Sequence, residues 1–229
     1  MYQSQHGSLC NSLKQLFVKL ETAGDAVEPF EFLNYFFGAF PQFAEKGEHG
    51  GFQQQDADEC FQNLLAVMEP VFPNKSGGSL IEELFGFNVQ FELKNTEDEN
   101  ELVTTNFETM RRLSCIIDNQ ASPVNTLTEG IEAGLVCDIE KFSEPNNRNC
   151  IYTKTGKIAS LPKYMIVQKI RFIWKASDEG TNTQARKAKI LRNVSFPKVL
   201  DLEPYITDEL KASLKTARDG EKKKLENMK

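Results

Sequence analysis

The chain has 229 residues, of which 40% are hydrophobic and 26% charged, the composition of a globular protein with one large or two small domains. The formal net charge of −6 gives no support to nucleic-acid binding. No apolar run approaches the ~20 residues of a membrane span, and the N-terminus has no secretory signal pattern. The five scattered cysteines never form a Cys-x-x-Cys pair, so we expect reduced thiols in the cytosol or nucleus.

The first third of the chain is predicted to be helical. Leu9, Leu13, Leu16, Phe17 and Leu20 share one face of a helix over 9–21, which Gly24-Asp25 ends. A second helix follows Pro29, carries phenylalanines at helical spacing and ends at Pro41. Seventeen phenylalanines against one tryptophan indicate a core built on Phe.

A polar stretch, Gln53-Gln54-Gln55-Asp56-Ala57-Asp58-Glu59-Cys60, precedes a third helix that runs to Met68. Asp56 and Glu59 have the spacing of a capping box, in which each side chain binds the other residue's backbone N–H. The glutamines are not needed for a helix, and their amides could pair with both N–H and C=O groups of an extended peptide. The alternative is a capped helix with a polar lead-in.

The rest of the chain is predicted to be mainly strands. Phe87, Val89, Phe91 and Leu93 alternate with polar residues, and the acidic run 95–101 is expected to be a solvated hairpin tip. Thr126 should cap a short helix. The remaining expectations are strands at 102–110 and 113–118, a strand and a turn within 137–151, a main strand region at 159–176, a mobile loop at 175–187 and a strand run at 194–197.

Three ordered segments of this sequence resemble the ubiquitin-specific cysteine proteases, also called ubiquitin carboxyl-terminal hydrolases. They are Gln54-Gln55-Asp56-Ala57-x-Glu59 (the glutamine box), Leu161-Pro162…Arg171-Phe172, and Phe196-Pro197-x-x-Leu200-Asp201-Leu202. With residues 39–48, the chain is most similar to the proteasome-associated branch. The resemblance implies an α+β, papain-like cysteine protease fold of thumb, palm and fingers. It places the helical thumb at 1–70, the fingers at 79–158, the palm strands at 159–205 and a charged helical or disordered tail at 206–229.

The resemblance also implies a binding site for the C-terminal tail of ubiquitin. Gln54, Gln55, Asp56 and Glu59 would line it, with Asp56 facing basic side chains and backbone amides of the tail. Asp56 could instead be an N-cap alone, and both roles can coexist. The loop that starts at Ile173-Trp174 resembles a surface loop that could gate the groove, the alternative being an aromatic side chain packed on the rim of the palm.

The catalytic boxes of the family are not found in this sequence. The Gly-Asn-Thr-Cys and Gly-His-Tyr boxes are absent; Cys10 lies among leucines of the first helix, and the histidines are His6 and His49. We therefore assign no catalytic residue and expect the chain to be the central part of a catalytic domain, incomplete at both ends and inactive alone. Some family members bind zinc through two Cys-x-x-Cys pairs in the fingers. This chain has none, so we expect no metal and no cofactor.

Three functions remain open from the sequence. The first is a piece of a deubiquitinating thiol protease whose whole form hydrolyses isopeptide bonds at the ubiquitin C-terminus. The second is a non-catalytic module that binds the ubiquitin tail, and the third is a scaffold with no ubiquitin contact. The expected partners are ubiquitin, ubiquitinated proteins and the proteasome, and neither nucleic acid nor a membrane.

Overall fold

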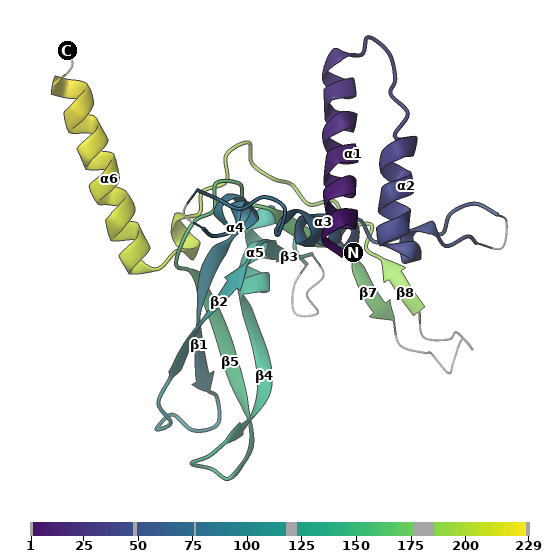
Figure 1. Ribbon diagram of the computed structural model, residues 1–229. Coiled ribbons are helices and arrows are strands. Elements are labelled where there is room, and N and C mark those ends of the chain that lie inside the picture. Colours follow the sequence, from purple (N-terminus) through teal and green to yellow (C-terminus); the bar gives the residue numbers. More distant parts are fainter. Residues whose placement is uncertain (1, 48–49, 76, 118–122, 176–185, 228–229) are drawn as a thin grey trace. The chain divides into compact units, whose positions relative to one another are not determined.

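The computed structural model describes residues 2–47, 50–75, 77–117, 123–175 and 186–227. They form two compact units, Met1–Leu84 and Phe85–Lys229. The first unit is helical, and the described strands all lie in the second (Figure 1). The first unit contains α1 (Tyr2–Thr22), α2 (Phe30–Ala39), the 3₁₀ turn η1 (Pro41–Ala44), α3 (Ala57–Met68) and most of α4 (Leu80–Phe85), which ends at the boundary. The second contains β1 (Phe87–Asn95), β2 (Thr104–Met110), β3 (Leu113–Ile116), α5 (Leu127–Leu135), β4 (Val136–Ser143), β5 (Arg148–Ile158), β6 (Val167–Ile170), β7 (Phe172–Lys175), β8 (Arg186–Lys189), η2 (Glu203–Tyr205) and α6 (Asp208–Asn227).

The first unit is built on phenylalanine, as the composition predicts. The ring of Phe36 is buried and lies 5.1–6.1 Å, centroid to centroid, from the rings of four other phenylalanines, which come from α2, from η1 and from the residue between them. Leu9 of α1 and Val67 of α3 complete this core. The predicted apolar face of α1 is only partly right, because Phe17 is 58% and Leu20 52% exposed. With 10 residues, α2 is too short to cover the 21 residues of α1.

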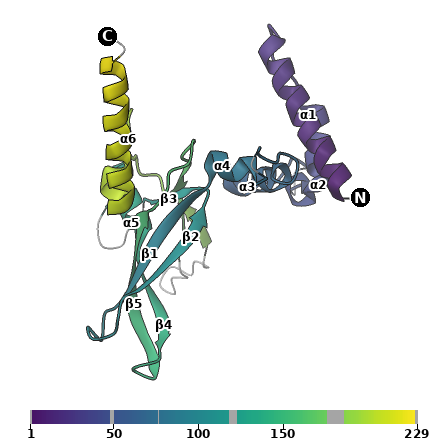
Figure 2. The same ribbon diagram turned by 60° about the vertical axis from the view of Figure 1, so that its left-hand side comes forward.

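The second unit is organised around a four-stranded antiparallel sheet with the order β2-β1-β5-β4. The predicted alternation in β1 is confirmed: Phe87, Val89, Phe91 and Leu93 are buried, and the exposed positions of β1 lie between them. The β1–β2 and β4–β5 hairpins extend side by side, and their loops lie together at one end of the sheet (Figure 2).

Helix α5 packs against β3 through two glycines. A Cβ at Gly130 would lie 2.3 Å from the sulfur of Cys115, and one at Gly134 would lie 2.2 Å from the carbonyl oxygen of Ser114. The predicted cap at Thr126 is confirmed and is a full capping box with Glu129. This helix and the inner half of the sheet enclose the main core, which includes Val89, Ile117, Ile131 and Ile158 among its fully buried side chains.

The prediction of a main strand region over 159–176 is right for its second half, which holds β6 and β7, and wrong for residues 159–166. β5 continues to Ile158, and the chain then has no regular structure until β6, which pairs in parallel with β3. Pro162 lacks the backbone N–H that a hydrogen bond within a sheet needs. Residues around it therefore form no strand, although the predicted region is rich in β-branched residues. β7 pairs with β8, and in the 194–197 run only Ser195 makes a bridge, to Thr126.

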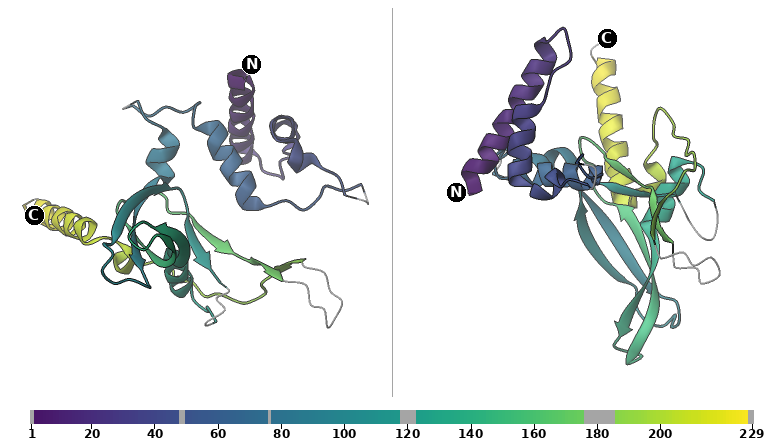
Figure 3. Two further views of the ribbon diagram at one scale, coloured as in Figure 1. Left: turned by 90° about the horizontal axis from the view of Figure 1, so that it is seen from below. Right: turned by 90° about the vertical axis from the view of Figure 1, so that its right-hand side faces the viewer.

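Residues 208–227 form α6, which is the helical one of the two alternatives predicted for the charged tail. Leu210 and Leu214 near its start pack on the main core, whereas its outer half extends away from the sheet (Figure 3). None of the helices in the described part of the chain has the length and hydropathy to cross a bilayer.

Candidate functional site

The glutamine box lies where the chain enters α3. Asp56 is the N-cap of this helix, and its Oδ1 accepts a hydrogen bond from the backbone N–H of Asp58 at 2.9 Å. The predicted reciprocal bond from Glu59 to the cap is wrong, because Glu59 is exposed and makes no such contact among the described residues. The N-cap role of Asp56 is therefore real, and it occupies one of the two carboxylate oxygens.

Gln53, just before the glutamine box, and Gln55 within it brace the preceding segment. The side-chain amide of Gln55 donates to the carbonyl oxygen of Gln42 at 2.8 Å, and that of Gln53 donates to the carbonyl oxygen of Lys46 at 3.3 Å. The backbone N–H of Gln53 also donates to the carbonyl oxygen of Glu45. Sequence reasoning placed Gln55 among the tail-binding residues; one of the two N–H groups of its amide is used within the chain, and a tail-binding role stays a prediction. Alternation of side chains in a non-helical segment, which turns 53 and 55 to one side and 54 to the other, could have indicated this.

The side chain of Gln54 lies between these braces and is exposed, as are those of Asp56 and Glu59. No hydrogen bond of the Gln54 amide is found within the described part of the chain. The unit thus presents a primary amide, just before α3, and two carboxylates, at the N-cap and in the first turn of α3. Together these groups can donate to carbonyls and accept from N–H groups of an extended chain.

The glycine-rich loop ahead of the box is closed by backbone hydrogen bonds. Lys46 and Phe52 form an antiparallel bridge, and the N–H of Gly47 donates to the carbonyl oxygen of Gly51 at 2.8 Å. Gly50 has a φ of +79°, which a residue with a Cβ rarely adopts. The ring of Phe52 packs against Phe37 at 5.1 Å, which ties the box to α2.

Both cysteines of the first unit have a raised pKa. Cys10 is buried in the Phe core, and burial raises the pKa of its thiol above the usual 9.0. Burial also raises the pKa of Cys60, on α3. A raised pKa lowers the thiolate fraction, and the thiolate is the reactive form of cysteine. His6 lies in α1, and His49 is outside the described residues.

Ile173 and Trp174 lie in the second unit, in strand β7 rather than in a loop. Ile173 pairs with Ala188 and Trp174 with Lys187 in the β7–β8 hairpin. The expected mobile loop after them overlaps residues 176–185, which lie outside the described residues. A gating role for this pair stays a prediction.

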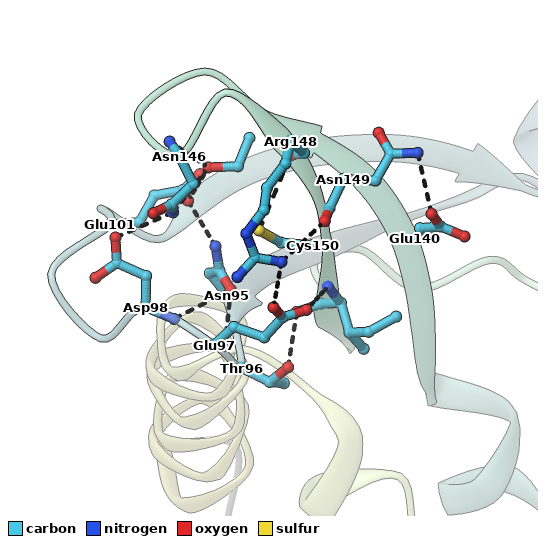
Figure 4. A network of polar contacts seen from close by, with 12 residues as sticks. Asn95, Thr96, Glu97, Asp98, Glu101, Glu140, Asn146, Arg148, Asn149 and Cys150 are labelled. Carbon is cyan, nitrogen blue, oxygen red and sulfur yellow. Dashed lines mark hydrogen bonds and ion pairs between the residues drawn. The ribbon is translucent and has the colours of Figure 1, made fainter.

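The loops at the outer end of the four-stranded sheet are joined by polar side chains (Figure 4). Glu101 accepts hydrogen bonds from the Tyr152 hydroxyl at 2.5 Å, the Asn95 amide at 2.7 Å and the Ser143 hydroxyl at 2.7 Å. Glu97 forms an ion pair with Arg148 at 2.6 Å. No group of three or more His, Cys, Asp or Glu side chains placed for a metal is found among the described residues. The predicted hairpin tip is confirmed, and four of its seven residues are exposed, but it also contains a hydrogen-bonded network that sequence reasoning missed.

The sequence matches the family described as ubiquitin carboxyl-terminal hydrolase over residues 1–219. The chain belongs to this family. It is 35% identical over 219 residues to ubiquitin carboxyl-terminal hydrolase 6 of Arabidopsis thaliana, which covers 94% of this chain and 43% of that protein. It is 38% identical over 199 residues to ubiquitin carboxyl-terminal hydrolase 6 of Schizosaccharomyces pombe, covering 84% of this chain and 39% of that protein. Ubiquitin carboxyl-terminal hydrolase 14 of Caenorhabditis elegans is 32% identical over 211 residues, which are 92% of this chain and 40% of that protein.

Membership in the ubiquitin carboxyl-terminal hydrolase family confirms the family resemblance drawn from the glutamine box and the two later segments. The papain-like cysteine protease fold of this family is consistent with the mixed helices and strands of the chain, which is an α+β protein. The chain spans less than half the length of these relatives.

Proposed function

We propose that this chain is the ubiquitin-binding part of a deubiquitinating thiol protease that hydrolyses isopeptide bonds at the ubiquitin C-terminus. The observation that carries the proposal is the exposed Gln54–Asp56 pair, held at the start of α3 by the braces of Gln53 and Gln55 in a chain of this family. Residues fixed in this way bind without losing much conformational freedom, which favours recognition of a flexible tail.

In this proposal each side chain has a separate role toward the extended ubiquitin tail. The Gln54 amide donates to one backbone carbonyl and accepts from one backbone N–H. The Asp56 oxygen that does not cap α3 faces basic side chains or N–H groups of the tail, and Glu59 adds a second carboxylate. A gating role for Ile173 and Trp174, which lie in the β7–β8 hairpin of the second unit, is a separate proposal that rests on the family resemblance. The first unit then corresponds to the thumb, the four-stranded sheet to the fingers, and the strands after Ile158 to the palm.

We also propose a place of action at the proteasome, in the cytosol or nucleus. The support is the resemblance of residues 39–48 to the proteasome-associated branch, together with five free cysteines, which suit a reducing compartment. Because the 229 residues hold no Gly-Asn-Thr-Cys or Gly-His-Tyr box, we expect this chain by itself to bind ubiquitin without cleaving it. A non-catalytic ubiquitin-tail-binding module is the second candidate, favoured by the burial of Cys10.

The test is ubiquitin binding by the chain with Gln54→Ala and Asp56→Asn combined. Asparagine is as good an N-cap as aspartate, so α3 should keep its stability while the charge is lost. We expect affinity for ubiquitin, measured by fluorescence anisotropy, to fall at least about tenfold, since each lost hydrogen bond to a charged group contributes about 1.5–3 kcal/mol. Ubiquitin that lacks its C-terminal tail should bind the unaltered chain as weakly as complete ubiquitin binds the double variant.

The matched control is Asp25→Asn, an exposed carboxylate in the turn between α1 and α2. It should leave affinity unchanged. Equal binding by the double variant and the unaltered chain would contradict the tail-binding proposal. It would favour the third function considered, a scaffold with no contact to the ubiquitin tail. Hydrolysis of a ubiquitin amide by the chain, abolished by Cys10→Ala, would overturn the assignment of no nucleophile.

A further inference from the structure

The outer edge of strand β2 is regular and open. Its seven residues pair with β1 without a bulge, from Met110 opposite Phe87 to Thr104 opposite Leu93. β2 is the first strand in the order β2-β1-β5-β4, so one of its two sides faces no other strand of this sheet. In the described part of the chain, no backbone hydrogen bond joins residues 104–110 to any element other than β1. The N–H and C=O groups on the outer side of β2 can therefore pair with a further strand.

β2 lacks the features that commonly keep sheet edges from pairing. Such features are proline, lysine, a bulge or a very short strand, and β2 has neither of these two residues. Its one charged side chain, Glu108, is already in an ion pair with Lys154, at 2.6 Å. Phe107 is 65% exposed, and Leu102 and Val103, just before the strand, are 89% and 49% exposed. Apolar surface therefore accompanies the open backbone.

The opposite edge of the sheet, β4, carries charges that disfavour pairing with a copy of itself. Two copies of a strand that pair about a twofold axis run antiparallel, and their residues face each other symmetrically about one central residue. With Asp138, Ile139 or Glu140 at the centre of β4, the two acids lie opposite each other or opposite their own copies. Like charges directly opposite destabilise a strand pair. Of the two edges, β2 is therefore the one suited to pair with its own copy.

We propose that two copies of this chain pair through β2, with Phe107 opposite Phe107 of the second copy, and so join their sheets. In this register Asn106 lies opposite Glu108, and an amide can donate to a carboxylate. Thr105 lies opposite Thr109, and aromatic and threonine cross-strand pairs both stabilise antiparallel strands. The symmetry uses both β2 edges, so the assembly ends at a dimer. A peptide of another protein could also add to an open edge, but the self-complementary order of residues in β2 favours a second copy.

Sedimentation equilibrium of the full chain from about 10 to 500 μM tests this dimer, because a small interface gives weak association. We expect a reversible monomer–dimer equilibrium. Phe107→Glu should raise the dissociation constant at least about tenfold, because two opposed carboxylates replace an aromatic pair. Phe142→Glu on β4 is the matched control, since Phe142 is a 51% exposed phenylalanine on the other outer strand. It should change the dissociation constant less than about twofold.

A mixture of charge variants tests whether position 107 faces its own copy. Phe107→Glu and Phe107→Lys should each stay largely monomeric, and they should associate when mixed, because opposite charges then meet. Association in the mixture also excludes misfolding as the cause of the loss.

Four results would overturn the proposal. The unaltered chain could stay monomeric over the whole concentration range, as it would if the edge accepted only a peptide. It could instead form assemblies larger than a dimer. Phe142→Glu could weaken association as much as Phe107→Glu does, or the mixed variants could remain monomeric.

Discussion

The Glu101 carboxylate is the centre of the network that joins the two hairpin loops. Its three donors, Asn95, Ser143 and Tyr152, are each at least 98% buried. Hydrogen bonds from Tyr152, then Asn95 and Ser143, lower the pKa of Glu101 below its usual 4.5. A carboxyl whose pKa is lower in the folded state stabilises the fold above its unfolded-state pKa and loses that contribution as the pH falls through the folded value.

Glu101→Gln should loosen both loops at neutral pH. The glutamine NH₂ group would face donors instead of accepting from them, so at least one buried donor loses its partner. In NMR spectra at pH 7 we expect the amide resonances of residues 95–101 and 143–148 to broaden or shift toward random-coil positions. The unaltered chain should show the same change on acidification to about pH 3.

Glu99→Gln is the control, since Glu99 is exposed and belongs to the same acidic run. It should leave the spectrum of both loops intact. Part of the acid response should survive in Glu101→Gln, because the backbone N–H of Ile151 and the side chain of Arg148 also lower the pKa of Glu97. If the two variants behave alike, Glu101 does not hold the loops together.

At the residue scale, roles that depend on neighbours in the sequence were predicted, whereas hydrogen-bond partners far away in the sequence were not. The acidic run at 95–101 was expected to be solvated. Its partners in the β4–β5 hairpin are 42 to 51 residues away from Glu101, and no pattern in the neighbouring sequence indicates them. The same holds for Gln55, whose acceptor at Gln42 lies 13 residues earlier. Asp56 was predicted as an N-cap correctly, because capping depends on neighbours in the sequence.

The α5–β3 contact depends on the absence of side chains on one face of a helix. Gly134→Ala would bring a Cβ against the backbone of Ser114, which cannot move as a flexible side chain does. We expect the free energy of unfolding of the second unit to fall by about 2 kcal/mol despite the better helix propensity of alanine. Urea titration followed by hydrogen exchange of β3 and β5 amides measures this.

Gly220→Ala in α6 is the matched control within the same unit, because a Cβ there meets nothing within 4 Å. It should raise helix stability by about 0.5–1 kcal/mol. A Gly134→Ala variant as stable as the unaltered chain would mean that α5 can move away from β3 without cost.

Elements with a clear local signal were predicted close to their bounds, and the strands predicted at 102–110 and 113–118 are found as β2 and β3, whereas the bounds of β6 and β7 within the predicted region 159–176 were not predicted. β1 and α5 have strict periodicity or a capping box, and both were found close to their true bounds. β6 is a strand because β3 offers it a parallel edge, and β7 because β8 does. No pattern within 159–176 distinguishes these short strands from the irregular residues before them.

The two units have separate cores, so we expect them to unfold separately. Phe36 contacts four other phenylalanines in the first unit, whereas the main core of the second unit has no member from that unit among the described residues. Phe36→Ala should destabilise the first unit by about 3–5 kcal/mol. Hydrogen exchange should accelerate in α1, α2 and α3 while β1 and β5 stay protected.

Phe30→Ala is the control, because Phe30 is 63% exposed at the start of α2. It should change exchange little. Equal loss of protection in β1 after Phe36→Ala would show that the chain unfolds as one cooperative body.

At the scale of the whole molecule, the family was predictable because its motifs are local. The glutamine box lies in the first unit and the segments at 161–172 and 196–202 in the second, and the family match spans both. The roles of these segments were predicted from resemblance, and the network at Glu101 was not, because it has no motif of consecutive residues.

The three glycines at positions 130, 134 and 156 restrict how this sequence can change over generations. Every amino acid that replaces glycine adds at least a Cβ atom, and at each of these positions that atom would lie within 2.7 Å of an atom of another residue. No conservative replacement exists there, unlike at a buried leucine, where isoleucine or methionine is often tolerated. Substitutions elsewhere in the surrounding strands can therefore accumulate one at a time, while these glycines can change only together with the groups they contact: the side chains of Cys115 and Phe91 and the backbone of Ser114.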